Sequence, residues 1–186
     1  AGENLSRMAC LVHDVANVMS RFVDAIMIRW FSNDEVVELA EHATVPVING
    51  LTDLLHPCQV MADIMTVEEH LGSIDGKNVV MVGDGNNLAN SWLNAACVFP
   101  FDFTLACPKG YEPDESILDA AEKAGASFRI TNDPQEGVEG AHVIYSDAFY
   151  SMGQEEEAKQ RRADFAPFRL TSELLAAADA KHIVLH

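Results

Sequence analysis

The stretch that decides the fold runs from residue 77 to residue 98 and reads KNVVMVGDGNNLANSWLNAACV. Its first part, Lys77 to Val82, is a valine-rich run of the kind expected for a strand that is buried on both faces. The turn Gly83-Asp84-Gly85-Asn86-Asn87 follows, and a helical pattern then continues through about Val98. A strand, a glycine-containing turn and a helix in this order are typical of the opening of a nucleotide-fold domain. The stretch therefore predicts an α/β domain with a doubly wound parallel sheet.

The same alternation continues toward the C-terminus. Apolar runs predict four further strands with helices between them, at Phe103 to Ala106, Ser127 to Thr131, His142 to Tyr145 and His182 to Leu185. Together with the first strand they would form a five-stranded sheet.

Upstream of residue 72 the pattern predicts part of another α/β domain. The expected elements are a helix ending near Arg21, a strand at Val23 to Ile28, a surface helix at Asp34 to Ala43, a strand at Val45 to Asn49 and a helix from Pro57 to about Leu71 that Gly72 ends. We therefore predict a partial first domain over residues 1–72, which includes the last helix as a bridge, and a second domain over residues 73–186.

The segment His56-Pro57-Cys58-Gln59 lies at the start of the bridging helix, where free backbone N–H groups favour an anion or a developing oxyanion. Arg29 ends the preceding strand, so His56 and Arg29 would reach one sheet edge from neighbouring strands. Two simpler interpretations stay open: His56 could only cap the helix, and Arg29 could only be a salt-bridge partner.

Two further positions could hold a substrate. The turn around Asn87 lacks the G-x-G-x-x-G spacing, which excludes NAD binding. It is either a plain strand-to-helix turn, with glycine for backbone freedom and Asn87 as the cap, or a site where the Asn87 amide points into an interdomain cleft. Asp147, in the loop Ser146 to Gly153, could pair with an α-ammonium group or could cap a helix.

Charge and cysteine usage narrow the classes of partner. Apolar residues make up 48% and charged residues 22% of the chain, and its formal net charge is -17, so nucleic acid and anionic membranes are poor partners. No run is long enough to span a bilayer, and no signal peptide is recognisable. The four cysteines show no C-x-x-C pairing and no zinc-finger spacing, so we expect no metal site and a reducing cytoplasm.

The motifs taken together resemble those of the ornithine carbamoyltransferases, within the aspartate/ornithine carbamoyltransferase family. The resemblance is carried by VPVINGLTD at 45–53, by HPCQ at 56–59, by GDGNN at 83–87 with Ser91, and by Asp147 followed by Ser151-Met152-Gly153, all in the family's order. The cysteine in HPCQ and the SMG loop favour the ornithine branch over the aspartate branch.

The resemblance implies transfer of a carbamoyl group from carbamoyl phosphate to the δ-amine of ornithine, giving citrulline and phosphate. It implies that Arg29, His56 and Gln59 contact carbamoyl phosphate, and that ornithine is held by Asn87, Asp147, Ser151 and Met152. It also implies a homotrimer, as in complete relatives, and no metal or organic cofactor.

The chain also departs from the family pattern. Asn17 replaces a usual arginine, Phe149 replaces a usual tryptophan, and Asn4 to His13 does not follow the family. Neither the upstream Ser-Thr-Arg-Thr-Arg phosphate loop nor the downstream Cys-Leu-Pro segment is present, so we expect a truncated or fragmentary chain. The alternatives are a non-catalytic amino-acid-binding homologue and a carbamoyltransferase that uses another amine.

Overall fold

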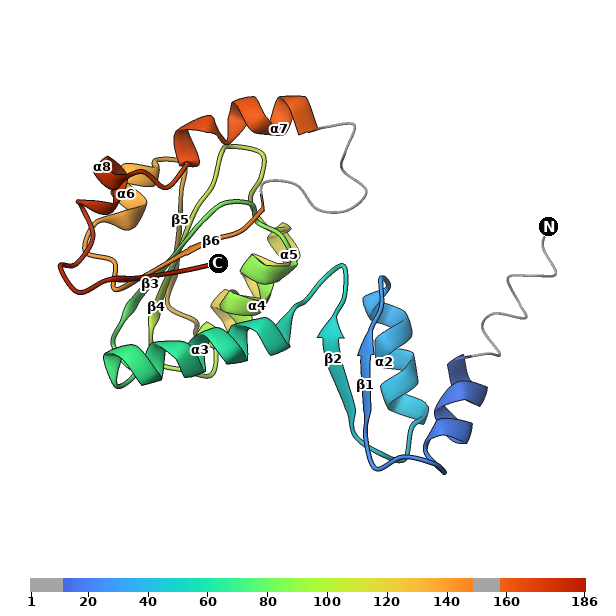
Figure 1. Cartoon of the computed structure of the whole chain (residues 1–186). Coiled ribbons are helices and arrows are strands. Elements are labelled where there is room, and N and C mark those ends of the chain that lie inside the picture. The colour runs from blue at the N-terminus through green and yellow to red at the C-terminus, as the bar shows by residue number, and fades with distance from the viewer. Residues whose placement is uncertain (1–11, 149–157) are drawn as a thin grey trace. The chain divides into compact units, whose positions relative to one another are not determined.

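The computed structural model describes residues 12–148 and 158–186, and it confirms the predicted α/β architecture (Figure 1). The chain forms two compact units, Ala1–Gln59 and Val60–His186. This division by compactness does not test the predicted domain boundary after residue 72, which stays a prediction.

The larger unit contains the predicted five-stranded sheet. Every strand is parallel to its neighbours, and the strand order is β5-β4-β3-β6-β7. The strands are β3 (Asn78–Val82), β4 (Asp102–Ala106), β5 (Phe128–Thr131), β6 (Val143–Ser146) and β7 (Ile183–Leu185). The chain adds strands on one side of β3 and then crosses to the other side, as a doubly wound sheet requires.

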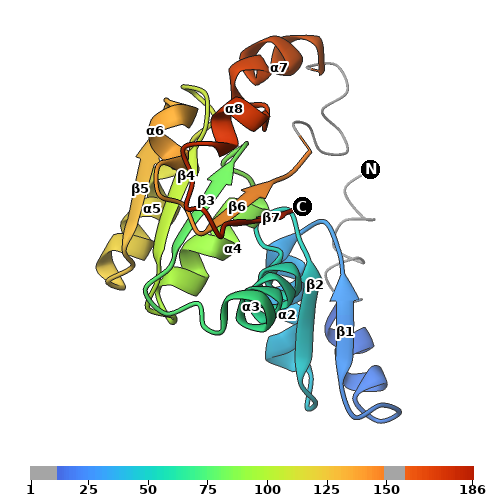
Figure 2. The ribbon, with the colours of Figure 1, turned by 60° about the vertical axis from the view of Figure 1, so that its left-hand side comes forward.

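Helices cover both faces of this sheet (Figure 2). On one face lie α3 (Pro57–Leu71), α4 (Asn87–Ala96) and α5 (Glu115–Lys123). On the other lie α6 (Pro134–Val138), α7 (Ala158–Asp164), the 3-10 helix η2 (Ala166–Phe168) and α8 (Ser172–Leu175). Strands β3 and β6 are therefore buried between two layers of helix, which explains their nearly continuous apolar sequences.

Strand β3 shows how one sequence serves both layers. Val79 and Met81 belong to the core that contains Trp92, whereas Val80 and Val82 belong to the core that contains Phe165. Successive side chains of a strand point to opposite faces. A strand in which apolar and polar residues alternate would therefore leave one face polar. The valine-rich run supplies apolar side chains to both.

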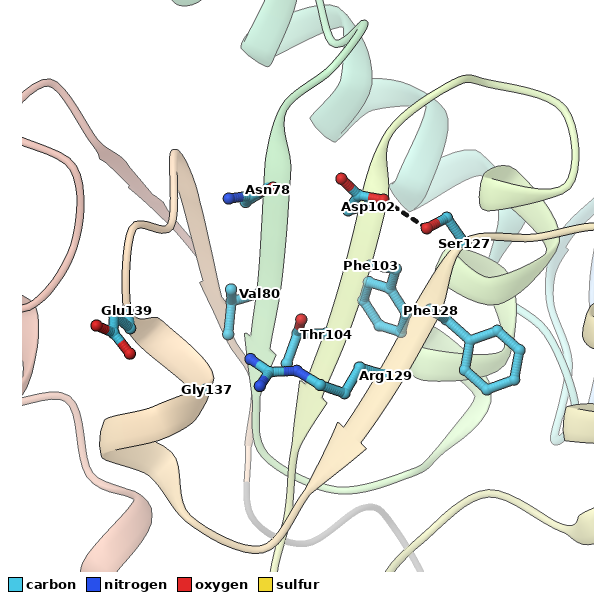
Figure 3. A pocket seen from close by; sticks show the side chains of 10 residues that line it. All are labelled: Asn78, Val80, Asp102, Phe103, Thr104, Ser127, Phe128, Arg129, Gly137 and Glu139. Carbon is cyan, nitrogen blue, oxygen red and sulfur yellow. Dashed lines mark hydrogen bonds between the residues drawn. The ribbon is translucent and has the colours of Figure 1, made fainter.

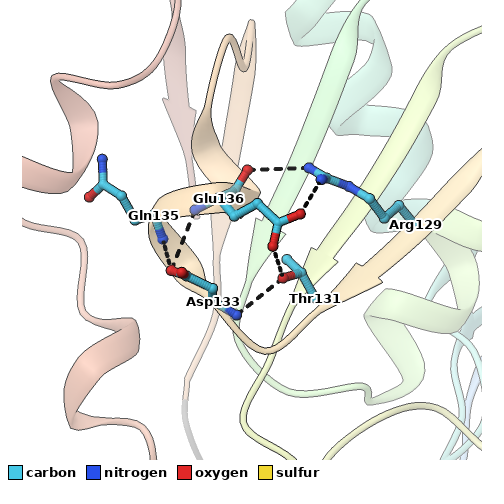
Figure 4. Close-up of polar contacts among 5 residues, drawn as sticks. All are labelled: Arg129, Thr131, Asp133, Gln135 and Glu136. Atoms are coloured by element: carbon cyan, nitrogen blue, oxygen red, sulfur yellow. Dashed lines mark hydrogen bonds and ion pairs between the residues drawn. The ribbon is translucent and has the colours of Figure 1, made fainter.

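Helix α6 is short and is held against the sheet by close packing and polar contacts. An added Cβ on Gly137 would lie 2.7 Å from the Ala106 Cβ, so glycine lets the helix approach the strand. Glu136 accepts hydrogen bonds from Arg129 Nη1 at 2.7 Å and from Thr131 Oγ1 at 2.9 Å, as Figure 4 shows. Asp133 caps the helix by accepting from two backbone N–H groups.

The turn between β3 and α4 differs from the sequence-based expectation in two details. Asn86, and not Asn87, is the N-cap: its side chain accepts from the N–H groups of Leu88 and Ala89, at 3.0 and 3.4 Å. Gly85 is needed for space rather than for backbone freedom, because its φ is not positive and an added Cβ would lie 2.4 Å from the backbone N of Pro113. The turn is thus fitted against a distant loop.

The smaller unit contains two parallel strands, β1 (Ile26–Arg29) and β2 (Val47–Leu51), and α2 (Asn33–His42), with a further helix at residues 12–19. Strand β1 begins three residues later than expected, because Phe22 and Val23 still donate to the Met19 carbonyl at the end of the preceding helix. Strand β2 runs two residues beyond its expected end at Asn49, to Leu51.

Replacing Gly85 with alanine should destabilise the larger unit by about 1–3 kcal/mol, because the new methyl group overlaps the backbone at Pro113. Gly83→Ala is the matched control: it lies in the same turn, and the nearest atom to its added Cβ is 3.9 Å away. Urea unfolding of both variants measures the difference. Equal losses of stability would show that the close approach at Gly85 does not matter.

Candidate functional site

In the smaller unit, the predicted residues follow the carboxyl ends of two adjacent parallel strands. Arg29 is the last residue of β1, it pairs in register with Leu51 of β2, and its side chain is exposed. His56 and Gln59 flank the start of α3 and are half-buried. The backbone thus brings Arg29 and His56 to one sheet edge, as expected. Within the described residues, Arg29 forms no ion pair.

In the larger unit, the predicted residues lie where β3 and β6 run side by side. Asn87 is the first residue of α4, and Asp147 directly follows β6. Register pairing of Val82 with Ser146 places the two loops opposite each other. Asn86 Nδ2 donates to Asp147 Oδ2 at 3.5 Å, a long hydrogen bond. This is the switch point of the sheet, where α/β proteins bind ligands.

Two predicted residues cannot be placed. Ser151 and Met152 lie outside the described residues, as does Phe149. Their roles in holding ornithine stay predictions.

A buried ion pair supports the turn at this switch point. Arg161 Nη1 lies 2.7 Å from Asp84 Oδ2, and the two side chains are only 7% and 11% exposed. The guanidinium also stacks on the ring of Tyr111, 4.9 Å from its centroid, and Tyr111 accepts from the Gly85 N–H through its carbonyl at 2.8 Å. Burial raises the pKa of Asp84 against the opposing effect of Arg161. The ion pair therefore stabilises the ionised form of Asp84, whereas burial without Arg161 would favour the neutral form.

Two other buried groups near these strand ends are unreactive at neutral pH. Burial raises the pKa of the Cys107 thiol to about 12, so it stays protonated at neutral pH and is no nucleophile. Burial also raises the pKa of Tyr145, whose side chain is hydrogen-bonded to Asp63. Both groups serve packing rather than proton transfer.

A groove of about 270 Å³ lies in the larger unit, over the opposite, amino-terminal halves of β3, β4 and β5 (Figure 3). Val80 and Thr104 lie on the sheet beneath it, Arg129 extends over Thr104, and Glu139 lies on the side of α6. Of the predicted substrate-binding residues, the two that the structure describes, Asn87 and Asp147, do not line it. In residues 12–148 and 158–186, no group of three or more His, Cys, Asp or Glu could hold a metal ion. No described helix is long and apolar enough to cross a membrane.

Sequence reasoning missed the Asp84–Arg161 pair and the role of Asn86. The two charged residues are 77 positions apart, and no local pattern links them. Asn86 and Asn87 are adjacent amides, and only the backbone conformation at position 86 selects the cap.

Replacing Arg161 with methionine should destabilise the larger unit by about 3–5 kcal/mol at neutral pH, because Asp84 would remain buried without its partner. Arg162→Met is the matched control, since Arg162 is the exposed neighbour on α7. Without Arg161, burial holds the folded-state pKa of Asp84 above its unfolded value. Protonation therefore stabilises the folded variant at low pH, and this contribution is lost as pH rises through the folded-state pKa.

Urea unfolding between pH 4 and pH 8 measures both effects. The stability gap between Arg161→Met and the parent should therefore narrow toward about pH 4. A gap that is small at pH 7, or that does not change with pH, would contradict a stabilising role for the pair.

Comparison with known proteins places both units in one family. Residues 75–186 match the Asp/Orn binding domain of the aspartate/ornithine carbamoyltransferases, and residues 5–69 match their carbamoyl-P binding domain. The ornithine carbamoyltransferase of Pelobacter propionicus is 55% identical over 174 residues, which cover 93% of this chain and 57% of that protein. The chloroplastic enzyme of Pisum sativum is 52% identical, over 93% of this chain and 46% of that protein.

Comparison with solved structures gives the same family. The ornithine carbamoyltransferase from Pyrococcus furiosus superposes with a TM-score of 0.87 at 46% identity, over 94% of this chain and 57% of that one. The anabolic enzyme from Campylobacter jejuni gives 0.87 at 32% identity, over 94% of this chain and 59% of that one. The chain thus spans about half the length of these relatives. With both of its units matched by the family's two domains, the chain belongs to the aspartate/ornithine carbamoyltransferase family.

Proposed function

We propose that this chain is part of an ornithine carbamoyltransferase, which transfers the carbamoyl group of carbamoyl phosphate to the δ-amine of ornithine and releases citrulline and phosphate. The observation that carries the proposal is the pair of domain matches, one for each substrate, over residues 5–69 and 75–186. Relatives at about half identity or more that are named ornithine carbamoyltransferases support ornithine as the acceptor.

In this proposal carbamoyl phosphate is bound by Arg29, His56 and Gln59. The guanidinium of Arg29 and the imidazole of His56 donate to the carbonyl oxygen, and the Gln59 amide accepts from the carbamoyl NH2 group. Their common position, after the ends of two adjacent strands or at the start of α3, supports these roles. An N-terminal helix end adds backbone N–H groups and a favourable dipole for an anion.

Ornithine is held by the second unit. The Asp147 carboxylate pairs with its α-ammonium group, and Asn87, Ser151 and Met152 complete the contacts. The position of Asn87 and Asp147 at the switch point supports this assignment. At neutral pH ornithine is a monocation and aspartate a monoanion, so the net charge of -17 favours ornithine over aspartate as the acceptor.

The reaction needs an uncharged δ-amine, because a protonated amine has no lone pair for attack. The amine nitrogen bonds to the carbamoyl carbon, and the carbonyl oxygen gains negative charge. The C–O bond to phosphate then breaks, and the departing phosphate takes the extra proton from the nitrogen, which leaves the side-chain nitrogen of citrulline neutral. Arg29 and His56 stabilise the charge on that oxygen. Alignment of the two substrates supplies the rest of the acceleration, without a covalent intermediate.

Two properties of the whole protein belong to the same proposal. We propose a cytoplasmic protein, which is supported by the free thiols of Cys58, Cys97 and Cys107. We also propose a homotrimer, which sedimentation of the product of the complete coding sequence would test. A monomeric, active enzyme would contradict the trimer alone.

His56→Ala, made in the complete coding sequence that contains this chain, should lower kcat for citrulline formation by about 10²–10³-fold, the usual effect of losing one oxyanion donor. His70→Ala is the control, because His70 is exposed near the other end of the same helix. No citrulline from the folded, unaltered protein would contradict the proposed function. Equal activity of the two variants would contradict the role of His56.

Asp147→Asn should raise KM for ornithine by about 10- to 100-fold, because a charge-assisted hydrogen bond worth roughly 1.5–3 kcal/mol is lost. The KM for carbamoyl phosphate should change little. Asp102→Asn removes an exposed carboxylate at the opposite end of the sheet and should leave both constants unchanged. Steady-state kinetics with each substrate varied in turn measures the effect, and an unchanged KM for ornithine would rule out the ion pair.

A further inference from the structure

Two loops leave the carboxyl edge of the small parallel sheet, and polar contacts join them. The loop after β1 covers residues 30–32, and the loop after β2 covers residues 52–56. The Trp30 N–H donates to the Leu51 carbonyl at 3.0 Å, and the Asp53 N–H donates to the Phe31 carbonyl at 2.7 Å. The backbones of the two loops are thus paired beyond the last register pair of the strands.

Thr52 is the centre of the side-chain contacts between these loops. Its side chain is fully buried, with 0% exposure. Its hydroxyl donates to Asn33 Oδ1 at 3.1 Å and accepts from the Leu55 N–H at 3.0 Å, while its own N–H donates to the Leu55 carbonyl at 2.7 Å. One hydroxyl therefore fixes the loop after β2 to the first residue of α2.

Asn33 is tied to the same loop by a second contact. Its backbone N–H donates to Asp53 Oδ1 at 3.0 Å. Two adjacent residues of one loop thus hold one residue at the start of α2, one through its side-chain oxygen and the other through its backbone. Such a pair of contacts restricts both the distance and the direction between the loops.

These contacts lie immediately beside Arg29 and His56, two of the three residues that the proposed function assigns to carbamoyl phosphate. Arg29 precedes Trp30, which is hydrogen-bonded to Leu51. His56 follows Leu55, which is held at both its N–H and its carbonyl by Thr52. The relative position of the two strand ends therefore depends on the buried hydroxyl.

We infer that Thr52 is a positioning residue for carbamoyl phosphate: by joining the loops after β1 and β2 through Asn33 and Leu55, it sets the separation of Arg29 and His56. This inference rests on the proposed function. Thr52 touches no reacting atom. It acts through the two residues beside the loops that it joins.

The test uses the product of the complete coding sequence, with kcat and KM measured for each substrate separately. Thr52→Val keeps the shape of the side chain and removes the hydroxyl, whereas Thr52→Ser keeps the hydroxyl. We expect Thr52→Val to lower kcat/KM for carbamoyl phosphate by about 10- to 100-fold, as misplacement of about 1 Å does, with KM for ornithine changed less than about 2-fold. Thr52→Ser should recover most of the loss.

Two further variants separate positioning from general destabilisation. Thr44→Val is the matched control in the same unit, because Thr44 is exposed and outside the network. Asn33→Ala removes the acceptor for the Thr52 hydroxyl, so combining it with Thr52→Val should cost little more than the worse single variant. If Thr52→Val does not fold, Asn33→Ala alone should show the same loss confined to carbamoyl phosphate.

The outcomes are distinguishable. An unaltered protein that makes no citrulline overturns the proposed function and this role with it. An active protein in which Thr52→Val leaves kcat/KM for carbamoyl phosphate unchanged overturns the role of Thr52 alone. A KM for ornithine that rises as much as the KM for carbamoyl phosphate, or losses that add in the double variant, also overturns it, because the hydroxyl would then serve only stability.

Discussion

Parallel pairing at the carboxyl ends of the strands is the constraint on which the rest of this structure depends. In the larger unit, β3 is flanked by β4 and by β6, and the chain leaves β3 and β6 toward different faces of the sheet. The loops after these two strands therefore face each other at one edge. In the smaller unit, the pairing of β1 with β2 does the same for the loops next to Arg29 and His56. Each unit thus presents one polar edge built from strand ends.

Burial determines which of two carboxylates at the edge of the larger unit is available to a cation. Asp84 and Asp147 influence each other electrostatically, and two negative groups near one another would repel. Arg161 neutralises Asp84 inside the unit, which leaves the half-buried Asp147 as the carboxylate available to a cation. In the smaller unit Arg29 is an exposed cation in a strongly acidic protein. This contrast fits an anionic substrate on one unit and a cationic one on the other.

Much of the fold could be predicted from the sequence, because local sequence patterns determine where its strands and helices lie. Apolar runs predicted the five strands of the larger sheet to within about one residue at each end, and Pro57 and Gly72 predicted the limits of α3. Strand β1 was less well placed, since the preceding helix still holds Phe22 and Val23. Contacts between residues far apart in the sequence could not be predicted from any local pattern. Gly85 must be glycine because of Pro113, and Asp84 is neutralised by Arg161. The candidate site was predicted as a set of strand-end residues, but the groups that hold those strand ends in place were not.

The central proposal is that the polar edge of each unit binds one of the two substrates. The most direct measurement is a crystal structure of the product of the complete coding sequence with a bisubstrate analogue, in which a phosphonoacetyl group is joined to the δ-nitrogen of ornithine. The account predicts that Arg29 and His56 contact the carbonyl oxygen of the analogue and that Asp147 contacts its α-ammonium group. An analogue bound elsewhere, or one that leaves Arg29, His56 and Asp147 turned away from it, would contradict the account.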